Sequence, residues 1–128
     1  MKRRHIASAY QSSRSYSPIV VTEGGRTIWL AGIIAREDEQ GRSLAHDFDG
    51  QVRCIFRKMS GMLADVNATL ADVVSMIVFI TDVSNNTRMV ELRKEFFKSD
   101  YPVSTLVTVK ALNRPELVVE ITATAVAE

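Results

Sequence analysis

The chain has 128 residues, of which 46% are hydrophobic and 24% charged, and its formal net charge is +1. This length and composition predict a single globular domain spanning residues 1–128 and exclude an intrinsically disordered chain. The balance of charge argues against nucleic acid as the main partner, because phosphate binding requires a basic surface.

Neither a membrane nor an oxidising compartment is indicated. The longest apolar run, around Val78, is far shorter than the roughly 20 residues that a membrane-spanning helix needs. The first residues are basic but lack the apolar core of a signal peptide, and the single cysteine, Cys54, has no partner for an internal disulfide. The sequence therefore predicts a cytoplasmic protein.

The first half of the chain is predicted to hold two strands and a helix. The strands lie in residues 18–35 and are joined at Gly24-Gly25, a pair that supplies the positive φ of a tight hairpin. Trp29 is assigned to the core or to an interface, and residues 36–46 to a loop. From Asp47 the apolar period is helical, and either Asp47 or Asp49 is the expected N-cap. The stripe consists of Phe48, Val52, Ile55, Phe56, Met59, Met62, Leu63 and Val66.

The second half is predicted to hold a strand, a helix and two further strands. Residues 75–82 are apolar on both faces of a strand, which indicates a central place in a sheet. A helix follows residues 84–87, a strand begins after Pro102, and residues 116–128 form the last strand. The order is β-β-α-β-α-β-β, an α+β domain with a mixed sheet and two helices on one face. We expect another copy of the chain to cover the other face.

The last strand carries a carboxylate that its pattern does not explain. One face holds only apolar residues, namely Leu117, Val119, Ile121, Ala123 and Ala125. Glu120 lies in the middle of the opposite face, where it either meets solvent or lines a pocket.

Most catalytic constellations are missing from the sequence. His5, His46 and Cys54 have no metal-ligand spacing, so no metal site is predicted, and no nucleophile elbow or phosphate-binding loop is present. Cys54 is assigned to core packing. Acid–base or electrostatic chemistry by a carboxylate and a tyrosine remains, without a cofactor.

Several motifs, in order and spacing, resemble the Rid family of YjgF-like reactive-intermediate deaminases. They are Tyr16-Ser17-Pro18, LAGIIA at 30–35, Gly50-Gln51-Val52-Arg53, ADVVSMIVFITD at 71–82, EFF at 95–97, Pro102 before a strand, and VEITATA at 119–125. The resemblance implies a chorismate-mutase-like fold and a homotrimer with ligand clefts between subunits. It also implies metal-free and cofactor-free hydrolysis of enamines and imines, such as 2-aminoacrylate, to keto acids and ammonia. Glu120 would position or activate water, and Tyr16 would be the pocket tyrosine.

The chain departs from the family at the residue that holds the substrate carboxylate. Ser104 stands where the family has an arginine two positions after the proline, so the bidentate clamp is absent. Either Arg14 or Arg93 supplies the charge from another direction, or the substrate is not a small 2-imino acid. Against these roles, Arg93 between Arg88 and Lys94 is typical of a solvated helix face, and Arg14 lies in a segment expected to be flexible. The predicted substrate-binding residues are Ser104, Thr105, Leu106, Arg14, Arg93, Val90 and Ile33.

Two functions follow from this pattern. The first is an enzyme that deaminates, hydrolyses or tautomerises a reactive enamine, imine or related catabolic intermediate, with Glu120 acting on water. The alternative is a small-molecule-binding or regulatory trimer that has lost the standard deaminase activity. RNA binding is the weakest interpretation, because no basic, aromatic-lined groove is evident.

Overall fold

The computed structural model describes all of residues 1–128. The strands are β1 (Lys2–Ile6), β2 (Ile19–Glu23), β3 (Arg26–Trp29), β4 (Val73–Ile80), β5 (Val103–Thr108) and β6 (Val119–Ala127). The helices are α1 (Ala9–Ser13), α2 (Phe48–Ala64) and α3 (Asn86–Phe96), with 3-10 turns at Leu70–Asp72 and Val83–Asn85. From β2 onward the order is the predicted β-β-α-β-α-β-β, and the α+β fold is confirmed.

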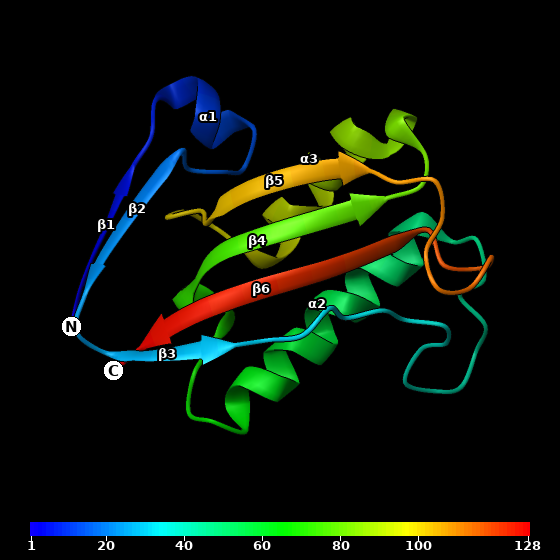
Figure 1. The fold of residues 1–128 in the computed structure, drawn as a ribbon, viewed down its shortest axis with the longest axis horizontal. Coiled ribbons are helices and arrows are strands. Elements are labelled where there is room, and N and C mark those ends of the chain that lie inside the picture. The colour runs from blue at the N-terminus through cyan, green and yellow to red at the C-terminus, as the bar shows by residue number, and fades with distance from the viewer.

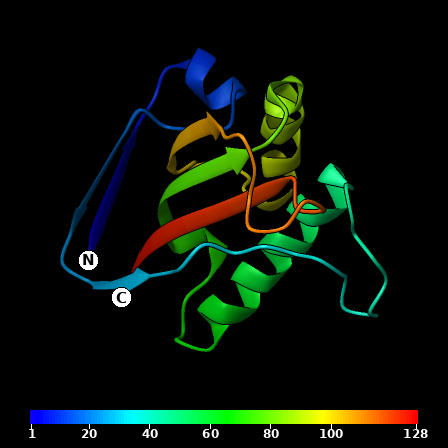
Figure 2. The same cartoon turned by 45° about the vertical axis from the view of Figure 1, so that its right-hand side comes forward.

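The main sheet has four strands in the order β3-β6-β4-β5. It is mixed, since β4 and β5 run parallel while β6 is antiparallel to both β3 and β4. β4 is an inner strand, as its two apolar faces predict. Both long helices lie on one face of this sheet, while β1 and β2 stand as a separate hairpin on the other side (Figures 1 and 2).

Pairing of β2 with β3 was the wrong expectation for residues 18–35. Gly24 and Gly25 do adopt positive φ, of 75° and 79°, but the chain turns away there instead of closing a hairpin. β2 pairs with β1, and β3 pairs with the end of β6, with Ile28 opposite Ala125. β3 ends at Trp29, so residues 30–35 are not a regular strand.

The N-terminal segment is also more regular than expected. β1 was not predicted because most of its residues are charged and show no apolar alternation. It pairs with β2 alone and lies outside the main sheet. Ser8 caps α1 through a capping box with Gln11. Arg14, which was expected in a flexible segment, is the C-cap of this helix.

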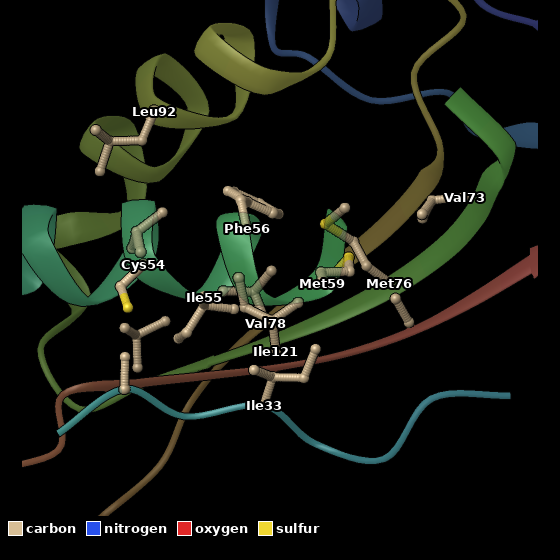
Figure 3. Close-up of a cluster of buried hydrophobic side chains, with 14 of the residues drawn as sticks. Ile33, Cys54, Ile55, Phe56, Met59, Val73, Met76, Val78, Leu92 and Ile121 are labelled. Carbon is tan, nitrogen blue, oxygen red and sulfur yellow. The ribbon is translucent and has the colours of Figure 1, made fainter. Parts of the chain in front are cut away.

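The core lies between α2, α3 and the covered face of the sheet (Figure 3). Asp47 is the N-cap of α2, and its Oδ1 accepts a hydrogen bond from the Gly50 amide at 3.0 Å. Most of the predicted stripe is buried, but Met62 and Val66, in or just beyond the last turn, are about 40% exposed. Trp29 is 78% exposed and is therefore not in the core of this chain.

The final strand shows the expected division into two faces. Its core face is buried throughout, at Leu117, Val119, Ile121, Ala123 and Ala125. No helix of the structure is both long and apolar enough to cross a membrane.

A buried amide fixes the approach to β6. Gln51 of α2 is fully buried; its Nε2 donates to the carbonyls of Leu44 (2.8 Å) and Glu116 (2.9 Å). Its Oε1 accepts from the Val118 amide at 3.0 Å. One side chain thus joins two irregular segments. It is the only hydrogen-bond partner of the Val118 amide, whereas the carbonyls of Leu44 and Glu116 also accept from the amides of Asp47 and His46.

We expect Gln51→Leu to lower the free energy of unfolding by about 1–3 kcal/mol, since the Val118 amide loses its only partner and two carbonyls lose one of their hydrogen bonds. Gln40→Leu, at an exposed position, is the matched control and should change stability by less than about 0.5 kcal/mol. Urea unfolding at one protein concentration measures both. A loss for Gln51→Leu no larger than that of the control would contradict this role.

Candidate functional site

Arg93 of α3 is buried, with 4% of its surface exposed. Its Nε donates to the Ser15 hydroxyl at 3.0 Å, Nη1 to the Ser104 hydroxyl at 2.7 Å, and Nη2 to the Arg14 carbonyl at 3.3 Å. The solvated helix face expected for Arg93 is therefore wrong. The side chain points from the helix toward β5 and contacts Ser104 there.

The electrostatic environment of Arg93 is unfavourable for its charge. Burial, followed by repulsion from Arg14, lowers its pKa from the usual value of an arginine to about 10. All its hydrogen-bond partners are neutral, and it forms no ion pair. The side chain is still charged at neutral pH, and a shift of this size corresponds to a cost of roughly 3 kcal/mol. The structure thus holds a buried cation without a counter-ion.

A turn after α1 brings the N-terminal segment onto α3. Ser15 is buried in a left-handed conformation, with φ 58°, which is costly for a residue with a Cβ. Its hydroxyl donates to the Val90 carbonyl at 3.0 Å while accepting from Arg93. The Ser17 amide donates to the Pro102 carbonyl at 3.0 Å, just before β5. These bonds place Arg14 and Tyr16 beside α3 and β5.

A pocket of about 260 Å³ lies between these three segments. It is lined by Arg14 and Tyr16, by Asn86, Met89, Val90 and Arg93 of α3, and by Ser104 and Leu106 of β5. Six of the predicted site residues therefore meet in one place, namely Arg14, Tyr16, Val90, Arg93, Ser104 and Leu106.

No acidic side chain lines this pocket, in contrast to the other hollows of the chain. The larger pockets contain Glu37 and Glu116 in one case and Glu23 in another, and the smallest contains Asp100. In the first of these, Arg36 is already paired with Glu116 at 3.3 Å. The pocket beside Arg93 is therefore positive, whereas the largest ones are of mixed charge.

Glu120 lies on the other face of the sheet. It is half-buried and pairs in register with Phe79 of β4, whereas Ser104 and Leu106 share the helix-covered face with Met76 and Val78. The Glu120 carboxylate covers Gly32, where a Cβ would collide with its Oε2. Within one chain the sheet keeps Glu120 apart from the arginine pocket.

Two further predicted residues are not in the pocket. Thr105 is exposed and alternates with Ser104 and Leu106 on β5, so it faces the open side of the sheet. Ile33 is 6% exposed and packs in the core beside Ile121, as Figure 3 shows. Its inclusion among the substrate-binding residues is a misplacement, caused by the irregular backbone after β3.

Three residues at or beside the pocket were not predicted from the sequence as site residues, namely Ser15, Asn86 and Met89. Asn86, Val90 and Arg93 are spaced i, i+4 and i+7, which places them on one face of a helix. That spacing was a usable signal for the pocket. Nothing in the sequence marks Ser15.

The remaining chemically active side chains form no second centre. Cys54 is buried in the core, as predicted, and burial raises the pKa of its thiol, which disfavours the reactive thiolate. His, Cys, Asp and Glu side chains do not gather anywhere in groups of three or more that could hold a metal ion.

The endoribonuclease L-PSP family profile matches residues 6–127 of the chain. A RutC family protein of Pyrococcus abyssi is 28% identical over 94 residues, covering 73% of this chain and 74% of its own. The crystal structure of the Rid family protein YyfB from Yersinia pestis has a TM-score of 0.85 and 26% identity, with 98% and 99% of the two chains covered. A Mycobacterium tuberculosis member of the YjgF/YER057c/UK114 family has 31% identity and a TM-score of 0.70, with 98% and 100% covered.

The chain therefore belongs to the L-PSP family, which is also the Rid or YjgF family. The resemblance stated from its motifs is confirmed. This membership supports a general role in processing small molecules.

Replacing Arg93 by an apolar residue of similar length should not destabilise the protein. Arg93→Met removes a buried charge that has only neutral partners, so we expect unchanged stability or a gain of up to about 3 kcal/mol. Thermal unfolding of the ligand-free variant and wild type, at equal concentration, measures this. A loss of more than about 1 kcal/mol would show that the hydrogen bonds of Arg93 outweigh its desolvation.

Proposed function

We propose that the protein hydrolyses a reactive enamine or imine to a keto acid and ammonia, in a cleft formed between subunits of a homotrimer. Membership of the Rid family and the retained pair Glu120 and Tyr16 support this proposal. The observation that carries it is the Glu120 carboxylate, half-buried over Gly32 on a sheet face that no helix covers.

The chemistry requires little from the protein. An enamine tautomerises to an imine, whose carbon is electrophilic once the nitrogen is protonated. Glu120 holds a water molecule against that carbon and accepts a proton as the C–O bond forms. The C–N bond then breaks, with ammonia leaving and the carbonyl of the keto acid remaining. No redox step occurs, so no co-reactant beyond water is needed.

A cleft between subunits would bring Glu120 of one copy beside the Arg93 pocket of another copy. Glu120 and the pocket around Arg93 lie on opposite faces of one sheet, so a site that contains both draws them from two copies. The open face has the apolar character of a covered surface: Trp29, Ile77 and Val107 are 78%, 38% and 38% exposed. This supports association through that face.

The second candidate is a binding or regulatory trimer without deaminase activity. The observation in its favour is Ser104 in place of the family's carboxylate-binding arginine. We rank the ribonuclease activity in the family's name behind both candidates. The 16 basic residues barely exceed the 15 acidic ones, whereas binding to phosphates depends on excess positive charge.

The loss of 2-aminoacrylate, generated by a dehydratase, tests the enzyme against the binder. We expect the wild type to accelerate its conversion to pyruvate and ammonia, and Glu120→Gln to lose at least about 100-fold of that rate, since the amide cannot accept the proton. Equal rates with and without the wild-type protein would remove the deaminase proposal. Unchanged binding of pyruvate by Glu120→Gln would then support the binder.

A methyl group at Gly32 should displace the carboxylate while leaving the fold intact. The colliding atom is the end of a flexible side chain, and Gly32 does not require positive φ. We expect Gly32→Ala to unfold within a few degrees of wild type but to lose about tenfold or more in turnover of 2-aminoacrylate. Gly61→Ala, on an open part of α2, is the control and should keep full activity. Full activity in Gly32→Ala would argue against a placed Glu120.

A further inference from the structure

We propose that the pocket beside the loop of residues 36–45 binds a small zwitterion, namely a free amino acid with a polar side chain. Glu37 pairs with the ammonium group of this ligand, and Lys58 pairs with its carboxylate. The pocket shares no lining residue with the one that contains Arg93, and neither Glu120 nor Tyr16 lines it. Binding there is therefore independent of the proposed function and goes beyond it.

This pocket has the size of a ligand site. Its volume is about 570 Å³, within the range of about 300–1,000 Å³ that is typical of small-molecule pockets. It lies between the loop of residues 36–45, Lys58 of α2 and Glu116, which precedes β6. Three segments that are far apart in the sequence thus form its walls.

Polar contacts hold the loop in one shape. Residues 36–43 are all charged, polar or glycine, so burial of apolar side chains does not order this part of the chain. Instead, Oδ1 of Asp38 accepts hydrogen bonds from two backbone amides of the loop, both at 2.9 Å. Arg57 of α2 pairs with Glu39 and attaches the loop to the helix. A wall that is ordered before the ligand arrives lowers the entropic cost of binding.

Two opposite charges line the pocket without an ionic partner. Of its four ionised side chains, Arg36 and Glu116 pair with each other at 3.3 Å. Glu37 and Lys58 take part in none of the nine ion pairs of the chain. Lys58 Nζ donates one hydrogen bond, to the Ile34 carbonyl at 2.8 Å. This bond fixes the ammonium group at the wall of the pocket and leaves its other N–H donors for a ligand.

The free charges select a ligand that carries both signs. Because the pocket holds two cations and two anions, it attracts neither anions nor cations as a whole. An anion is attracted by Lys58 but repelled by Glu37, and a cation meets the reverse. A zwitterion pairs with both groups at once.

The remaining lining restricts the side chain of the ligand. Only Ile34 and Ala45 are apolar, so the pocket offers little to an aliphatic or aromatic group. The Ser43 hydroxyl accepts from the Ala45 amide at 3.2 Å and donates to no protein group, so its O–H is free for a polar side chain. Since Glu37 and Lys58 are both exposed, each ion pair with the ligand is weak, and we expect a dissociation constant of about a millimolar.

An NMR titration of the whole protein with three matched probes tests this site. L-Glutamine carries both charges, 4-aminobutanamide lacks the carboxylate, and 4-carbamoylbutanoate lacks the ammonium group. We expect L-glutamine to shift the amide signals of Gly41, Ser43 and Ala45, and to bind about threefold to tenfold more tightly than either analogue. Equal binding of the three probes, or unshifted loop signals at about 50 mM L-glutamine, would overturn the site.

Variants assign each charge of the ligand to its partner. Glu37→Gln should remove the preference for L-glutamine over 4-carbamoylbutanoate, because the ammonium group that distinguishes them has lost its partner. Lys58→Gln should remove the preference over 4-aminobutanamide, and Lys58→Arg should keep it, since the positive charge remains. Lys110→Gln, which changes an exposed lysine outside the pocket, is the matched control and should bind like wild type.

The order of the loop is tested separately. Asp38→Ala removes the carboxylate that holds two loop amides and the Arg42 side chain, but it leaves the charges that line the pocket in place. We expect it to weaken binding of all three probes by a similar factor of about threefold or more, because the loop must then be ordered on binding.

Unchanged preferences in both Glu37→Gln and Lys58→Gln would also overturn the site. Glu120→Gln should bind L-glutamine like wild type, because Glu120 does not line this pocket. If the preferences hold while the wild type does not turn over 2-aminoacrylate, the zwitterion site stands and the proposed deaminase fails.

Discussion

Both long helices pack on one face of the four-stranded sheet, and this constraint decides where every chemically important side chain can lie. Because side chains alternate along a strand, Ser104 and Leu106 point toward α3 while Glu120 points to the uncovered side. The carboxylate and the positive pocket are therefore separated by the sheet within one chain. A joint site exists only if a second copy brings its uncovered face to the first copy's pocket.

The buried guanidinium of Arg93 sets the electrostatic character of the pocket between α3 and β5. An arginine on the strand would reach a ligand directly, whereas this chain places the charge on the helix and a serine on the strand. The folded chain then carries an ionised group whose hydrogen-bond partners are all neutral. A local loss of folding stability of this kind is characteristic of sites that are organised for a ligand and not for stability.

Much of the fold could be predicted from the sequence because hydrophobic period and capping are local signals. The helix that begins after Asp47, the inner strand β4 and the core face of β6 are examples. The first strand could not be predicted, because its charged residues carry no apolar alternation. Pairing of β3 with β6 instead of β2 depends on contacts across about 100 residues. The burial of Arg93 could be predicted only in part. Arg93 follows the inward-facing Met89 by four residues, which places both on one face of the helix, but its cationic neighbours suggested a solvent-exposed face.

Complementation between two variants, each altered in one half of the site, tests most directly whether the two halves of the site come from different subunits. Glu120→Gln and Arg93→Met carrying different tags would be co-expressed, and the mixed assemblies purified and assayed with 2-aminoacrylate. Each trimer that contains both variants keeps both native halves at one of its three interfaces, so we expect the purified mixed assemblies to recover about a third of the wild-type turnover. Mixed assemblies no more active than either variant alone would contradict it.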